Sequence, residues 1–123
     1  MLDETTIQKY IQLDNDVSNY QDRGDGLYQF DAGVNGRPEL GMAPIVLSTK
    51  VNPTMVQMLS KIDVSGDGLA ATGTAGVVGA VQLGEAYYLR YTIFRDFAEP
   101  LAITNGIQAL AFAYSVYRQH APA

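Results

Sequence analysis

Residues 68–84 of the chain read GLAATGTAGVVGAVQLG and carry no charged side chain. Small residues recur there at spacings of three, four and four positions: Gly73, Gly76, Ala80 and Gly84. On an α-helix, this spacing places them on one face. A glycine inside a helix costs about 1 kcal/mol relative to alanine, and close packing against another backbone is the usual compensation. The stretch therefore predicts a helix, from about residue 69 to about residue 95, that packs tightly against a second helix.

A second stretch without charged residues, PLAITNGIQALAFAYSVY, covers residues 100–117. Pro100 suits the first turn of a helix, and the pattern predicts a helix that ends near His120. This stretch has its own stripe of small residues: Ala102, Gly106, Ala109 and Ala113. Residues 68–123 are therefore predicted to form a helical hairpin, in which the two stripes are the helix-packing interface.

The first part of the chain shows weaker patterns. Residues 4–20 are predicted to form an amphipathic helix, because apolar side chains recur on one helical face. Glycines and prolines interrupt residues 21–44, which are predicted to be a long arm that either contains a short hairpin at residues 27–30 or lies on a neighbouring subunit. Residues 45–51 favour a strand. A short helix is expected over residues 52–63, since it begins with the pair Asn-Pro.

These expectations describe a mainly α protein with two regions. An acidic N-terminal region, residues 1–67, has ten acidic and five basic side chains, and the helical hairpin, residues 68–123, has three of each. The net charge of −5 argues against nucleic acid as a partner. The absence of cysteine excludes disulfides and thiolate metal sites. The start of the chain lacks the apolar core that is typical of a secretory signal.

Three environments suit the predicted hairpin. In a lipid bilayer, the charge-free stretches of 17 and 18 residues reach only the lower end of the length that a spanning helix needs, although stripes of small residues favour helix contact there. In a soluble bundle or homo-oligomer, the polar residues of both stretches face water. In a filament or shell, the hairpin packs against copies of itself. The expected location is a membrane or a membrane-containing assembly, with the cytoplasm as the alternative.

One short turn is a candidate cation site. Asp63, Ser65 and Asp67 match the first half of a calcium-binding loop, in which alternate side chains converge on the ion. The position of the closing bidentate carboxylate is occupied by Thr74, so calcium would be bound weakly at best. A polar turn explains the same residues without an ion, and no other cofactor is expected.

Side chains for enzymatic chemistry are scarce in this sequence. His120 is the only histidine, which excludes a histidine cluster or a catalytic triad elsewhere. We therefore expect a non-enzymatic structural or assembly protein, either a homo-oligomer or part of a larger assembly such as a virion. Its hairpin inserts in a membrane or packs among like subunits. The alternative is a soluble helical binding module with a weak cation-binding loop at residues 63–68.

Overall fold

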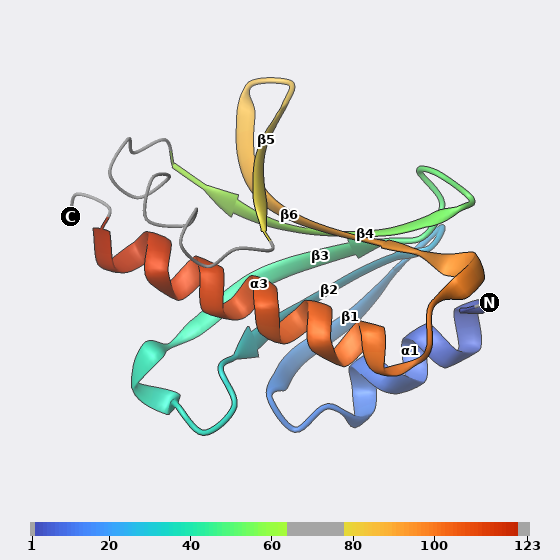
Figure 1. The fold of residues 1–123 in the computed structure, drawn as a ribbon, viewed down its shortest axis with the longest axis horizontal. Helices are drawn as coiled ribbons and strands as arrows, with labels where there is room; N and C mark the ends of the chain where they lie inside the picture. Colours follow the sequence, from blue (N-terminus) through green and yellow to red (C-terminus); the bar gives the residue numbers. More distant parts are fainter. Residues whose placement is uncertain (1, 64–77, 121–123) are drawn as a thin grey trace.

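The computed structural model describes residues 2–63 and 78–120. These residues form an N-terminal helix, a six-stranded antiparallel sheet and a long C-terminal helix (Figure 1). Two short 3-10 helices, labelled η, lie between the larger elements. In chain order the elements are α1 (Glu4–Leu13), β1 (Val17–Gly24), β2 (Leu27–Gly33), η1 (Pro38–Leu40), β3 (Met42–Ser48), β4 (Met55–Ile62), β5 (Gly79–Leu83), β6 (Ala86–Phe94), η3 (Arg95–Phe97) and α3 (Leu101–His120).

The sheet has the strand order β1-β2-β3-β4-β6-β5, and every neighbouring pair is antiparallel. β1 and β2 are joined by Asp25 and Gly26, which have positive φ angles of 55° and 73°, as in a type I′ hairpin turn. β6 lies between β4 and β5, so β5 is the outermost strand on its side. Strands from residues 1–67 and strands from residues 68–123 share this single sheet.

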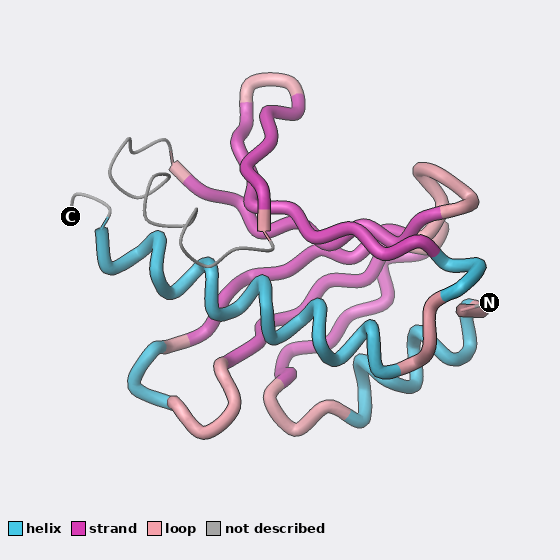
Figure 2. Tube along the Cα trace, in the orientation of Figure 1, coloured by secondary structure: helices cyan, strands magenta, loops and turns pink. Residues whose placement is uncertain are grey.

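One face of the sheet is covered by helices. α3 packs across β2, β3, β4 and β6, and α1 contacts both α3 and β1 (Figures 1 and 2). Every second side chain of each central strand points toward these helices. The core consists of these strand residues, the buried side of the helices and Leu2, which precedes α1. Its largest fully buried members are Leu2, Ile7, Ile11, Tyr28, Phe30, Ile45, Leu47, Met58, Leu89, Ile103, Ile107 and Leu110.

The prediction of a mainly α fold is therefore wrong, because the described residues build a sheet that the two helices cover. The short helix predicted for residues 52–63 is instead β4. Val56, Met58 and Ile62 point into the core at every second position. Ser60 shares this face, where its hydroxyl donates to a carbonyl oxygen of β3 at 2.7 Å. That polar residue interrupts the apolar alternation, and the remaining apolar residues also fit a helical period.

The predicted helical hairpin of residues 68–123 is also wrong. In the described part of the predicted first helix, the chain instead forms β5, a tight turn and β6. Ala80 lies in β5, and Gly84 lies in the turn with a φ of 65°. Gly73 and Gly76 lie outside the described residues. The spacing of small residues fits a helix, but the aromatic and β-branched residues of β6 favour a strand.

In residues 2–63 and 78–120, no helix is both long enough and apolar enough to cross a lipid bilayer. The description of the chain as a membrane protein that inserts through a helical hairpin is corrected accordingly. α3 has 20 residues, and its most apolar side covers the sheet.

The last helix lies where the sequence predicts it. α3 begins at Leu101, directly after Pro100, and ends at His120. The first helix also forms, but it ends at Leu13 instead of near residue 20, because Val17 already begins β1.

The strand expected over residues 45–51 overlaps β3. The long arm predicted for residues 21–44 is wrong, because these residues contain most of the β1–β2 hairpin, η1 and the start of β3. The short hairpin that we considered at residues 27–30 does not form there, because these residues belong to one strand, β2, of a hairpin whose turn is Asp25-Gly26. Asp25-Gly26 is a strong local signal for a two-residue hairpin turn. Hydrogen bonding between β2 and β3 makes much of the remaining segment regular structure.

Candidate protein-binding patch

Arg95 joins three distant parts of the chain at the end of β6. Its backbone N–H donates to the Thr54 carbonyl oxygen at 2.9 Å, and its carbonyl oxygen accepts from the Leu2 N–H at 3.0 Å. Its guanidinium donates from Nε to the Leu2 carbonyl oxygen at 3.0 Å and from Nη1 to the Thr49 carbonyl oxygen at 3.2 Å. The N-terminal segment, the turn between β3 and β4 and the start of η3 are thereby held together.

Large apolar side chains project into solvent beside this anchor. Phe94, Phe97 and Leu101 are 66%, 95% and 60% exposed, and Val51, in the β3–β4 turn, is 76% exposed. The β6–α3 connection and the β3–β4 turn lie at the same end of the molecule (Figure 1). We group these four residues because Arg95 holds the turn that carries Val51 to the segment that carries the other three, and we call them the 94–101 patch. A single exposed apolar residue is normal on a protein surface, but a group of large ones is typical of a binding site for another protein.

A polar network beneath α1 supports the turn that Arg95 holds. The Tyr28 hydroxyl donates to Glu4 Oε2 at 2.9 Å and accepts from Gln8 Nε2 at 2.8 Å. Thr49 Oγ1 donates to the other oxygen of the Glu4 carboxylate. Burial, together with the neighbouring Glu4, raises the pKa of Tyr28 to about 12. The phenol therefore stays protonated near neutral pH and joins α1 to β2.

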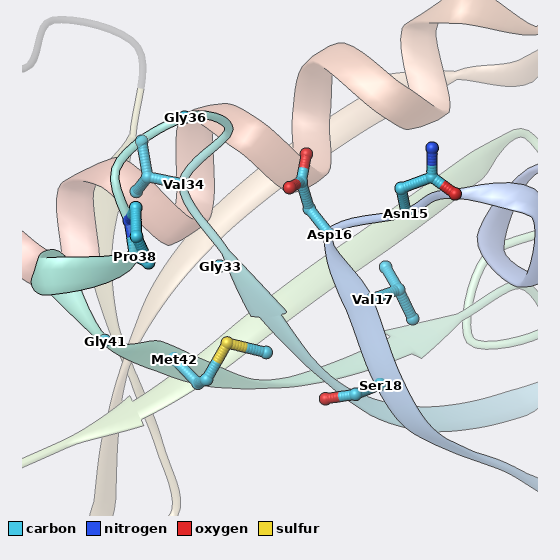
Figure 3. A pocket seen from close by; sticks show the side chains of 10 residues that line it. All are labelled: Asn15, Asp16, Val17, Ser18, Gly33, Val34, Gly36, Pro38, Gly41 and Met42. Carbon is cyan, nitrogen blue, oxygen red and sulfur yellow. The ribbon is translucent and has the colours of Figure 1, made fainter.

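A pocket of about 250 Å³ opens where β1 begins and β2 ends (Figure 3). Asp16 is the one ionisable residue among the ten that line it, and its carboxylate points toward α3. Gln108 Nε2, on α3, donates to Asp16 Oδ2 at 3.3 Å and to the Gly33 carbonyl oxygen at 3.0 Å. Gln108 Oε1 accepts from the Asn35 N–H at 2.9 Å. These contacts hold α3 to two loops, and we assign the polar rim of the pocket a structural role.

The candidate cation loop is described only at its first residue. Asp63 follows β4 and is exposed, whereas Ser65 and Asp67 lie outside the described residues. Asp63 lines an open hollow of about 440 Å³ together with Lys61 and Glu85. In the part of the chain that the structure describes, no group of three acidic or histidine side chains is placed to hold a metal ion. Calcium binding at residues 63–68 stays a prediction.

Four of the predicted packing residues lie on α3. Gly106 and Ala113 are buried, and Ala102 and Ala109 are half-buried. At Gly106 the close neighbour is the sheet and not a second helix. A Cβ atom there would lie 2.8 Å from Cε1 of Tyr91.

The predicted packing residues Ala80 and Gly84 lie in the β5–β6 hairpin. Both are exposed, and a Cβ atom on Gly84 would meet nothing within 4 Å. The positive φ of Gly84 explains the glycine by turn geometry.

Phe97 and Leu101 were not identified as surface residues by sequence analysis, which treats the chain up to residue 95 as the aromatic end of a helix. A local signal exists: Phe97 follows Asp96 and lies three residues before Pro100, in a break between two elements. Such connections run over the surface, so a large apolar side chain in one of them is expected to be exposed.

Known proteins add no assignment. No protein-family model and no curated protein sequence matches this chain. The 94–101 patch is therefore assigned from geometry and exposure. That the protein has no enzymatic activity and does not bind nucleic acid stays a prediction.

Proposed function

We propose that this protein is a non-enzymatic assembly component that binds another protein subunit through the 94–101 patch. The observation that carries the proposal is Phe97, which is 95% exposed and lies two residues after Arg95, whose backbone is anchored. Aromatic side chains are enriched at the centres of protein interfaces and often dominate their binding energy. Anchored backbone also loses little conformational freedom on association, which favours its use as an interface.

The corrected fold changes how such assembly would work. The sequence pattern suggested contact through a helical hairpin, whereas the patch presents side chains from a strand end, a 3-10 turn, the first turn of a helix and the β3–β4 turn. A partner with a shallow apolar hollow, into which Phe97 inserts, is the complement of this surface.

A photo-crosslinking amino acid at position 97 tests the proposal in cells that make the protein. We expect a discrete adduct with one protein subunit, identified by mass spectrometry, and its loss when Leu101→Asp is added. The matched control is position 13, because Leu13 is 67% exposed but lies at the end of α1. Identical adducts from both positions, or none from position 97, would overturn the proposal.

A second variant separates binding from folding. Phe97→Ser removes a side chain that makes little contact within the chain, so the melting temperature is expected to stay within about 2 °C of the parent. The same variant should remove the adduct formed by a crosslinker placed at position 94. An unchanged adduct would show that Phe97 does not contribute to the interface.

A further inference from the structure

β5 is the last strand of the sheet that the described residues form, and four of its five residues are exposed: Gly79, Ala80, Gln82 and Leu83. It pairs with β6 in a continuous register from Gly79 opposite Arg90 to Leu83 opposite Ala86. Residues that flank a two-residue turn form a hydrogen-bonded pair, and bonding then alternates along an antiparallel ladder. The N–H and C=O groups of Ala80 and Gln82 are therefore directed away from β6, toward the outer edge.

The two edges of the sheet differ in their protection. β1, at the other edge, has two register shifts in its ladder, a positive φ of 57° at Asn19, and the charged residues Asp22 and Arg23. Bulges and charges of this kind prevent an edge from accepting another strand. β5 reads GAVQL, with no charge, no proline and no shift in its register. Of the two edges that the described strands form, β5 is therefore the one suited to accept an extended strand.

The sequence of β5 is complementary to itself. Consider two β5 strands that pair antiparallel and centred on Val81. The backbone of Ala80 in each copy then forms hydrogen bonds with the backbone of Gln82 in the other, and Leu83 of each copy lies opposite Gly79 of the other. Leu83 is exposed, and a Cβ atom at Gly79 would meet nothing within 4 Å. The Leu83 side chain of each copy therefore lies beside the open space at Gly79 of the other copy, once on each side of the central Val81 pair.

The charge distribution also suits contact between identical copies. Each chain has a net charge of −5, so most surfaces of two copies repel each other. The described hairpin, residues 79–94, contains only Glu85 and Arg90 as charged residues and is neutral. Pairing at β5 therefore places no like charges directly opposite each other.

We propose that β5 pairs with β5 of a second copy, antiparallel and centred on Val81, so that one sheet continues through a homodimer. This contact lies apart from the 94–101 patch and does not depend on it.

Sedimentation of the full chain tests the dimer. We expect the wild type to form a species of twice 13.3 kDa and Gln82→Pro to raise the dissociation constant by about tenfold or more, since proline removes an outward N–H that β6 does not use. Gln82→Ala, the matched control, keeps that N–H and should keep the dimer. A monomeric wild type at millimolar concentration, or a Gln82→Pro variant that dimerises like Gln82→Ala, would overturn the proposal.

A single cysteine tests the register, even if Gln82→Pro does not fold. The chain has no cysteine of its own, and Val81 opposite Val81 is a non-hydrogen-bonded pair, whose Cα atoms are about 4.5 Å apart and within reach of a disulfide. Val81→Cys should form disulfide dimers at least tenfold faster than Leu83→Cys. Equal rates would reject this register. Phe97→Ser should leave both results unchanged, which separates failure of the dimer from failure of the proposed patch.

Discussion

Gly106 allows α3 to approach the sheet closely. A Cβ atom at this position would lie 2.8 and 2.9 Å from two ring carbons of Tyr91 and 3.1 Å from Cε of Met58. These distances are shorter than ordinary contacts, so any side chain here must displace the ring or lift the helix. The glycine that looked like a helix–helix contact residue thus serves a helix–sheet contact.

Gly106→Leu is expected to lower the free energy of unfolding by about 1–3 kcal/mol, the usual cost of extra volume in a packed core. Urea denaturation measures this change. Asn105→Leu, at the exposed neighbouring position, is the control and should change stability by less than about 0.5 kcal/mol. Equal effects at the two positions would show that α3 does not contact the sheet at Gly106.

Tyr28 links stability to alkaline pH. Its folded-state pKa of about 12 lies above the ordinary value of 10.0, so folding favours the protonated phenol. This contribution is complete below pH 10.0 and is lost as the pH rises through about 12. We expect stability to fall over this window, and to fall less steeply in Tyr28→Phe. Denaturant unfolding at a series of pH values checks this, and identical slopes in both proteins would contradict it.

At the scale of elements, Gln108 is the main polar connection between α3 and the loops at one end of the sheet. It contacts Asp16 before β1, Gly33 at the end of β2 and Asn35 in the following turn. One side chain thereby fixes the helix relative to two segments that are far from it in sequence.

Gln108→Ala should destabilise the protein by about 1–2 kcal/mol, because several hydrogen bonds are lost together. The Asn35 amide, which loses its acceptor, should also exchange with solvent faster, as measured by hydrogen exchange. Gln119→Ala, on the exposed end of the same helix, should change neither quantity. Unchanged exchange at Asn35 would refute this role of Gln108.

Elements with local signals could be predicted from the sequence, and those defined by distant partners could not. Pro100 and a long apolar run mark α3, and Asp25-Gly26 marks the first hairpin. β4 and β6 depend on pairing such as Met55 with Phe94, across 39 positions of the chain. No local period reveals that pairing, and the spacing of Gly and Ala before β6 fits a helix equally well.

The candidate patch was hidden for a related reason. The break before Pro100 is a local signal for the exposure of Phe97, but the position of Phe97 beside the β3–β4 turn depends on the contacts of Arg95. The partners of Arg95 are near residues 2, 49 and 54, which local patterns do not bring together. Only the assembled sheet places these groups side by side.

At the scale of the whole molecule, the charge of −5 opposes the proposed dimer through long-range repulsion. Salt shortens the range of that repulsion from about 30 Å at 0.01 M to about 8 Å at 0.15 M. The dimer dissociation constant is therefore expected to fall when salt is raised between these concentrations, as sedimentation equilibrium can measure. A constant that rises with salt would mean that ion pairs, and not the neutral β5 edge, hold the copies together.

The strand order has an evolutionary consequence. Among the described strands, β5 pairs only with β6, and β6 also pairs directly with β4. Substitutions at the exposed positions of β5 therefore leave the ladder from β1 to β6 in register. These positions can therefore change at little cost in stability, so a descendant of this chain could acquire a new binding partner at this edge.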